Sequence, residues 1–117
     1  MVVSMLAELT DDDTDRIFHA LADRTRRDIV MRSLTAENSV SELASRYDMS
    51  FAAVQKHVAV LEKAGLVTKL RSGRERLVRG DVEVIRRAGH LLAQYEQVWQ
   101  GRVTRMDALL AEHRDQE

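Results

Sequence analysis

Two helix-start signals that follow each other closely constrain the fold of this chain more than any other feature. The segment Ser39–Glu42 has the form of a capping box, in which the serine accepts a backbone hydrogen bond and the glutamate returns one. The helix that it starts should end near Tyr47, and Ser50 then caps a second helix that Gly65 can end in a left-handed conformation. The inward stripe of this second helix is Val54, Val58 and Leu61. Residues 39–65 therefore predict a helix-turn-helix.

The residues after this helix pair predict a small β-hairpin. Leu66–Leu70 has the composition of a strand, Ser72-Gly73 can form a turn, and Arg76–Val78 can return antiparallel to the first strand. Residues 66–80 would then be the wing of a winged helix-turn-helix. The expected fold class is mainly α with this one hairpin.

Two further helices are expected before the pair. Asp11–Asp13 would place negative charge at the positive end of the first helix dipole, and Asp23 can cap the next helix. The polar residues 35–38 should end that second helix. The apolar positions of the two helices are Ile17, Phe18, Leu21 and Ala22, then Ile29, Val30 and Leu34.

The C-terminal part, residues 81–112, predicts one long helix with an apolar stripe that only Arg102 interrupts. The stripe consists of Ile85, Ala88, Leu92, Tyr95, Trp99, Met106 and Leu109, widened by Leu91, Val98 and Leu110. So small a domain cannot bury all of this face, and a second copy of the chain is the simplest partner. The expected dimer interface is Leu92, Tyr95, Trp99, Met106 and Leu109.

The charge of the chain is unevenly distributed. The 117 residues suit a single domain spanning 1–117, and their formal net charge is only −1. Residues 50–80, however, carry seven Lys or Arg against two Asp or Glu, a net charge of +5. This basic segment indicates binding of a polyanion such as DNA, with a merely solvated charged face as the alternative.

Targeting signals and cysteine chemistry are missing from the sequence. The N-terminal residues 1–6 lack the basic segment of a signal peptide, and no apolar run is long enough to cross a bilayer. There is no cysteine, so neither a disulfide framework nor thiolate chemistry is expected. A cytoplasmic location follows as the expectation.

Several motifs together resemble the ArsR-type (ArsR/SmtB) winged helix-turn-helix regulators. They are the run Ala20–Ile29 (ALADRTRRDI), which is similar to the family pattern ALADPTRRxI, the segment Ser39–Ala44, and the stretch Val54–Val67. The likeness covers about residues 14–110, and its C-terminal helix resembles the metal-independent, autorepressor-like branch. Arg24 stands where the family usually has proline. The resemblance implies a dimeric transcriptional repressor.

In this architecture the second helix of the pair lies in the major groove as the recognition helix. Its candidate DNA contacts are Ser50, Phe51, Ala52, Gln55, Lys56 and His57. Gln55 can bond adenine, and Lys56 can donate to guanine or phosphate. Phe51 can instead pack against the preceding helix, and a structural or phosphate-contacting role suits His57 better than a catalytic one.

Arginines of the wing are the second set of candidates. Arg71, Arg74 and Arg76 flank the predicted turn and can bind phosphates or enter a narrow minor groove, unless they serve only solubility. Arg79 is a weaker candidate, since it can belong to the strand ladder. Arg26 and Arg27 can touch phosphates or pair internally with Asp23 or Asp28.

No metal, cofactor or catalytic site is expected. Ser39 and Ser41 occupy the region where a thiolate sensor needs cysteines, and Asp81, Glu83 and His90 do not match the spacing of the C-terminal metal site. The sequence has no nucleophile–base pair and no phosphate loop, so an enzyme is not expected.

Two functional questions stay open from the sequence. A winged-helix adaptor that binds a protein instead of DNA is the alternative function, because a fold does not fix a function. A small-molecule effector could bind between the C-terminal helices and the core, near Tyr95 and Trp99.

Overall fold

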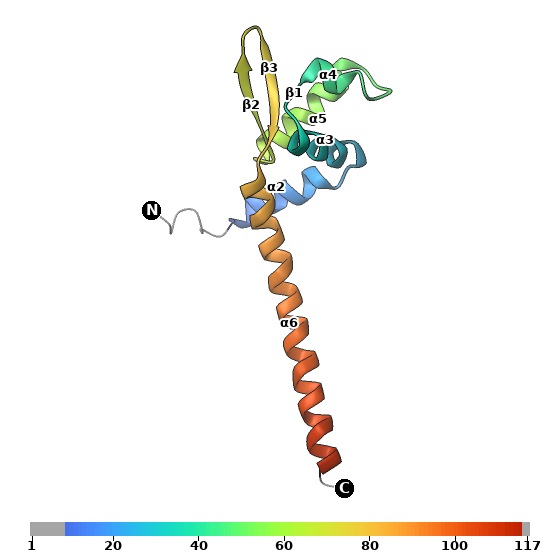
Figure 1. Cartoon of the computed structure of the whole chain (residues 1–117), viewed down its shortest axis with the longest axis vertical. Coiled ribbons are helices and arrows are strands. Elements are labelled where there is room, and N and C mark those ends of the chain that lie inside the picture. The colour runs from blue at the N-terminus through green and yellow to red at the C-terminus, as the bar shows by residue number, and fades with distance from the viewer. Residues whose placement is uncertain (1–8, 116–117) are drawn as a thin grey trace, which may run out of the picture. The chain divides into compact units, whose positions relative to one another are not determined.

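The computed structural model describes residues 9–115, so the N-terminal stretch without signal-peptide features lies outside the described residues. In these residues the chain forms a mainly helical fold with one small antiparallel sheet, whose strand order is β1-β3-β2 (Figure 1). The elements are α2 (Asp11–Leu21), α3 (Arg24–Thr35), β1 (Asn38–Ser39), α4 (Val40–Ala44), α5 (Phe51–Lys63), β2 (Val67–Ser72), β3 (Glu75–Gly80) and α6 (Val82–Asp115). The chain divides into two compact units, one ending at Arg87 and the other beginning at Ala88.

Side-chain caps start the helices where the sequence predicted them. The Ser39 hydroxyl accepts from the Glu42 amide at 3.1 Å, and the Glu42 carboxylate accepts from the Ser39 amide at 3.1 Å. Asp23 accepts from the Arg26 amide at 2.9 Å, and Ser50 accepts from the Ala53 amide at 3.1 Å. These caps satisfy amides that have no partner within their own helix. One cap was not predicted. Helix α2 begins after Thr10, which forms a second capping box with Asp13.

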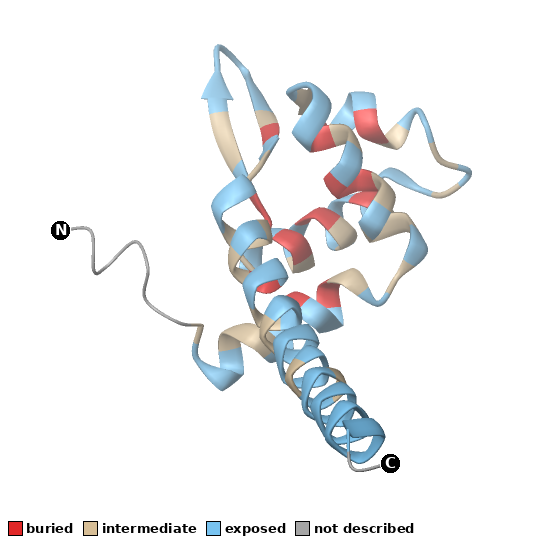
Figure 2. Cartoon of the chain, turned by 60° about the horizontal axis from the view of Figure 1, so that its bottom comes forward, coloured by how far each residue is buried: buried red, intermediate tan, exposed pale blue. Residues whose placement is uncertain are grey.

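The core of the first unit gathers on the inward sides of its helices and sheet (Figure 2). Val54, Val58 and Leu61 of α5 are each 0% exposed, which confirms the predicted inward stripe of this helix. The other fully buried large side chains are Ile17, Ile29, Leu43, Leu66, Val67 and Val78.

Three of the predicted inward residues are instead exposed, among them Ala22, which follows the last residue of α2. Phe18 is 36% exposed and Leu34 is 43% exposed, so neither belongs to the core. Leu34 lies against Gly80, where an added Cβ would come within 2.8 Å of its Cδ2 atom. Close approach to the sheet therefore fixes the end of α3, and the Leu34 side chain is directed partly outward.

The wing is a three-stranded sheet, not a lone hairpin. Strands β2 and β3 pair from Val67↔Gly80 to Ser72↔Glu75, which leaves Gly73 and Arg74 as the turn, one residue later than predicted. Gly73 has φ +62°, a conformation that glycine adopts without strain and that suits the first turn position of a tight hairpin. The short strand β1 was not predicted, and it pairs Asn38 with Val78 and Ser39 with Leu77.

Helix ends follow local chemistry. Gly65 has φ +79° and follows the C-terminal end of α5, as predicted. Helix α4 is shorter than predicted, because its last residue is Ala44 and the chain then turns through residues 45–49. The Asp81 carboxylate accepts from the Glu83 amide at 3.0 Å at the start of α6. No helix among residues 9–115 is long and apolar enough to span a membrane.

Candidate nucleic-acid interface

The outward face of α5 presents a row of exposed side chains opposite the buried stripe. Phe51, Ala52, Gln55 and Lys56 are exposed, and Phe51 keeps 48% of its surface open. Ser50 is also exposed, but its hydroxyl oxygen already accepts the Ala53 amide. The structure therefore brings five of the six recognition-helix candidates to one accessible face, with Gln55 and Lys56 free to contact a ligand.

His57 lies apart from this row. Its side chain is 22% exposed, and its Nδ1 atom lies 3.3 Å from the Arg26 Nη1 atom and 4.0 Å from an Asp23 carboxylate oxygen. The ring thus connects the middle of α5 to the start of α3. This contact gives His57 a structural role in orienting α5, whichever contacts it also makes with a ligand.

The side chains of Arg26 and Arg27 donate hydrogen bonds to backbone carbonyls at the C-terminal end of α2. Arg26 donates from Nε to the Ala20 carbonyl at 2.7 Å and from Nη2 to the His19 carbonyl at 3.1 Å. Arg27 donates to the Leu21 carbonyl at 2.8 Å. The His19 carbonyl also accepts from the Ala22 amide at 3.2 Å, but the last carbonyls of a helix generally lack backbone partners, and cations are favourable at a helix C-terminus. The two arginines therefore serve the fold through backbone carbonyls, a pairing that the sequence did not predict.

Asp23 is the anion of the same cluster. The Arg26 amide, followed by His57 and the Arg26 guanidinium, holds the pKa of the Asp23 carboxyl below its usual value. The cap of α3, the end of α2 and the side of α5 are thus joined by three polar side chains.

The wing concentrates unpaired positive charge. Arg71, Arg74 and Arg76 are all exposed, and none has a hydrogen bond or an ion pair among residues 9–115. Arg71 and Arg76 are direct partners across β2 and β3, an arrangement that is unfavourable for like charges. An anion placed between them would relieve the repulsion.

Other basic residues of the sheet are already engaged. The Arg79 Nε atom donates to Glu37 at 2.8 Å, and the Lys69 Nζ atom lies 3.8 Å from a Glu62 carboxylate oxygen. The engagement of Arg79 agrees with its place as a weaker candidate.

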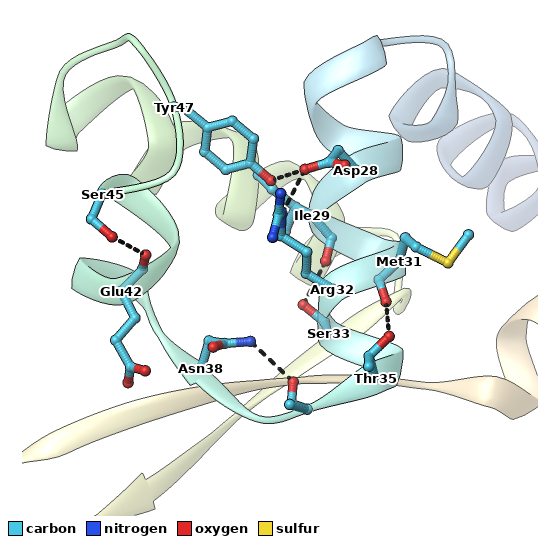
Figure 3. A network of polar contacts seen from close by, with 11 residues as sticks. Asp28, Ile29, Met31, Arg32, Ser33, Thr35, Asn38, Glu42, Ser45 and Tyr47 are labelled. Atoms are coloured by element: carbon cyan, nitrogen blue, oxygen red, sulfur yellow. Dashed lines mark hydrogen bonds and ion pairs between the residues drawn. The ribbon is translucent and has the colours of Figure 1, made fainter.

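A polar network that the sequence analysis missed joins the turn after α4 to helix α3 (Figure 3). The Tyr47 hydroxyl donates to Asp28 at 2.5 Å, and Arg32 donates to the same carboxylate at 2.8 Å. The Arg32 guanidinium also lies 5.9 Å from the centre of the Tyr47 ring. This network ties the turn between α4 and α5 to helix α3.

The network shifts the pKa values of its members. The Tyr47 hydroxyl, and then Arg32, lower the pKa of Asp28 below its usual value. Burial, and then the bond to Asp28, raise the pKa of Tyr47 to about 12. The fold therefore favours an ionised Asp28 beside a protonated Tyr47.

Tyr47→Phe should lower the free energy of unfolding by about 1 kcal/mol near neutral pH, because it removes one hydrogen bond to a carboxylate. In the parent chain, the Tyr47 contribution is complete below the ordinary tyrosine pKa and is lost as pH rises toward about 12. The Asp28 contribution is lost at the other end, as pH falls through its lowered pKa. Urea unfolding between pH 7 and 11 measures the difference, and an equal alkaline loss of stability in both proteins would contradict the assignment.

The second unit carries an exposed apolar stripe along α6. Seven large apolar side chains from residue 92 onward have exposures between 50% and 74%, and they include all five predicted dimer-interface residues. They are Leu92, Tyr95, Val98, Trp99, Met106, Leu109 and Leu110. Arg102, which interrupts the stripe, lies with its guanidinium 5.7 Å from the centre of the Trp99 ring. An apolar face of this length is characteristic of an interaction surface.

No group of three or more His, Asp or Glu side chains that could hold a metal ion occurs within the described part of the chain.

Comparison with known proteins decides the family. The family described as "Bacterial regulatory protein, arsR family" matches residues 23–69. The HTH-type transcriptional regulator YuzN of Bacillus subtilis (strain 168) is 40% identical over 72 residues, which cover 55% of this chain and 77% of that protein. The crystal structure of an ArsR family transcriptional regulator, RHA00566, is 31% identical with a TM-score of 0.73, covering 80% of this chain and 97% of that one. The chain belongs to the ArsR family.

This ArsR-family chain is a winged-helix transcriptional regulator. A further neighbour, the winged helix-turn-helix DNA-binding domain of Mb0332 from Mycobacterium bovis, supports the fold alone. It is 22% identical, has a TM-score of 0.61, and covers 78% of this chain and 91% of that one.

Proposed function

We propose that this ArsR-family regulator binds operator DNA as a homodimer and represses transcription. The observation that carries the proposal is the pairing of an exposed, uncommitted row on α5 with unpaired arginines on the wing. Both lie within residues 50–80, the segment with a net charge of +5. Such a regulator works in the cytoplasm, and the proposal assigns it no catalytic step.

The row on α5 would read sequence in the major groove. Gln55 makes paired hydrogen bonds with adenine, and Lys56 donates to guanine or to a phosphate. Phe51 and Ala52 offer apolar contact to a thymine methyl group, and Ser50 lies at the helix end nearest the bases. His57 would act mainly by holding α5 in place through Arg26.

The wing would supply contacts that do not depend on sequence. Arg71, Arg74 and Arg76 neutralise phosphates or enter the adjacent minor groove. Because each phosphate contact releases counterions, the affinity for DNA should fall steeply as salt rises.

The stripe on α6 would form the dimer interface through Leu92, Tyr95, Trp99, Met106 and Leu109. The Mb0332 domain, which has the same fold, is described as homodimeric. Two recognition helices would then bind half-sites about 34–36 Å apart, one turn of duplex DNA.

Gln55→Ala should relax sequence preference more than it lowers overall affinity. Loss of a paired contact to one base removes about 1–3 kcal/mol of discrimination at that position. Selection of bound sequences from random duplex DNA first gives the operator, and fluorescence anisotropy on single-base variants then measures the preference.

Arg74→Ala provides the contrast. It should weaken binding to all duplexes alike, and it should reduce by about 1 the slope of log affinity against log salt concentration. Arg16→Ala on α2 removes the same charge outside the proposed interface and should leave binding unchanged. If the selection recovers no duplex DNA and the chain instead binds a specific protein, the alternative function of a winged-helix adaptor is favoured.

A further inference from the structure

An open cleft of about 390 Å³ lies between α3 and the segment that runs from β1 through α4 to the following turn. Asp28, Arg32, Ala36, Asn38, Leu43 and Arg46 are among its lining residues. The cleft belongs entirely to the first unit and shares no residue with the proposed DNA and dimer surfaces. Its volume falls within the usual range for sites of small molecules.

Most polar groups of the cleft are already paired. Asp28 accepts from both Tyr47 and Arg32, so the charge of Arg32 is compensated (Figure 3). The Asn38 amide donates to the Ala36 carbonyl at 3.2 Å. These contacts shape the walls and leave little demand for a polar ligand beside α3.

Arg46 is the exception. Its side chain is exposed, and within residues 9–115 its guanidinium has neither a hydrogen bond nor an ion pair. The accessible apolar surface of the cleft comes from Ala36, which is exposed, and from Met31, which is 65% exposed. The cleft thus combines one uncompensated positive charge with an apolar surface.

We propose that this cleft binds a small organic monocarboxylate, with the carboxylate on Arg46 and the hydrocarbon part against Met31 and Ala36. A guanidinium binds a carboxylate through two parallel hydrogen bonds, which are among the strongest polar contacts in proteins. An inorganic anion would leave the exposed surface of Met31 and Ala36 uncovered, and a neutral apolar molecule would leave the arginine unpaired. A monocarboxylate with a short chain or a ring satisfies both.

The position of the cleft gives such a ligand a route to DNA binding, and this step rests on the proposed function. Arg46 precedes Tyr47, whose bond to Asp28 ties the turn between α4 and α5 to α3. A molecule held between Arg46 and α3 contacts both sides of that joint. It would therefore favour one angle of the recognition helix over others, as differential binding requires.

Titration of the full-length protein with benzoate and hexanoate, without DNA, tests the binding step. Amide chemical shifts recorded by NMR should move saturably at residues 35–38 and 43–47, whereas benzyl alcohol and hexanol should not move them. Arg46→Gln should weaken carboxylate binding by about tenfold or more. Arg16→Gln, with the same change in net charge away from the cleft, should have no effect, and circular dichroism confirms that both variants fold.

The proposal is overturned if neither carboxylate gives saturable shifts, if the alcohols bind equally well, or if Arg46→Gln binds as tightly as the parent chain. Weaker DNA binding by Arg46→Gln, without any carboxylate binding, would instead assign Arg46 to an operator phosphate and also overturn the proposal. Since the titration contains no DNA, it is independent of the proposed function. If the protein binds carboxylates but does not bind DNA, only the proposed effect of the ligand on DNA binding is overturned.

Discussion

Glutamate at both Tyr95 and Trp99 should convert the regulator from dimers into monomers and weaken operator binding by about 100-fold or more. The two side chains are 64% and 57% exposed in the single chain, and the proposed dimer buries both. Burying unpaired carboxylates there is strongly unfavourable, while glutamate is a good helix former and leaves α6 intact. The monomer keeps its α5 row and its wing but loses the gain from binding two half-sites at once.

Sedimentation equilibrium measures the loss of the dimer, and fluorescence anisotropy with the selected operator measures the loss of DNA affinity. Gln97→Glu is the matched control, because Gln97 is exposed on α6 and lies outside the apolar stripe. It should remain dimeric and bind DNA like the parent. A double variant that is still dimeric with unchanged affinity would show that another surface joins the two copies.

Leu61→Ala should lower the free energy of unfolding by about 2–5 kcal/mol, a large share of the roughly 5–15 kcal/mol that stabilises a domain. Leu61 is 0% exposed, and its carbonyl accepts the Leu66 amide where α5 gives way to the strand that follows. Truncation leaves a cavity beneath the recognition helix. Urea unfolding followed by circular dichroism measures the loss.

Glu62→Ala changes the neighbouring residue on the exposed side of α5. It removes only the 3.8 Å ion pair to Lys69, so stability should change by about 0.5 kcal/mol or less. Equal effects of the two substitutions would mean that α5 does not pack as described.

Local signals explain how much of the fold the sequence could predict. Capping by Ser39 and Ser50, and the left-handed end at Gly65, depend on residues only a few positions apart, and all three were predicted. Local signals could not predict strand β1, because its two residues form a strand only by pairing with Val78 and Leu77, far along the chain. Phe18 and Leu34 fit a helical apolar pattern, yet the packing of the neighbouring elements leaves them partly exposed.

In the candidate site too, the features that depend on local sequence were predicted and those that depend on long-range packing were not. The exposed row with Gln55 and Lys56 follows from helical periodicity, and the structure places those residues on one face as expected. The contact of His57 with Arg26 joins residues 31 positions apart, and Tyr47 meets Asp28 across 19 positions. Neither pairing has a signature in a single sequence, since each depends on how the helices pack.

The facing arginines of the wing, Arg71 and Arg76, make the free protein and its proposed complex respond to salt in opposite directions. In the free protein, added ions screen the repulsion between the two guanidinium groups and tighten the hairpin. In the complex, the same ions compete with the phosphates that would otherwise separate those charges. If the wing binds DNA as proposed, the hairpin would be loosest when unbound at low ionic strength and would be ordered by the DNA, at some cost in binding free energy.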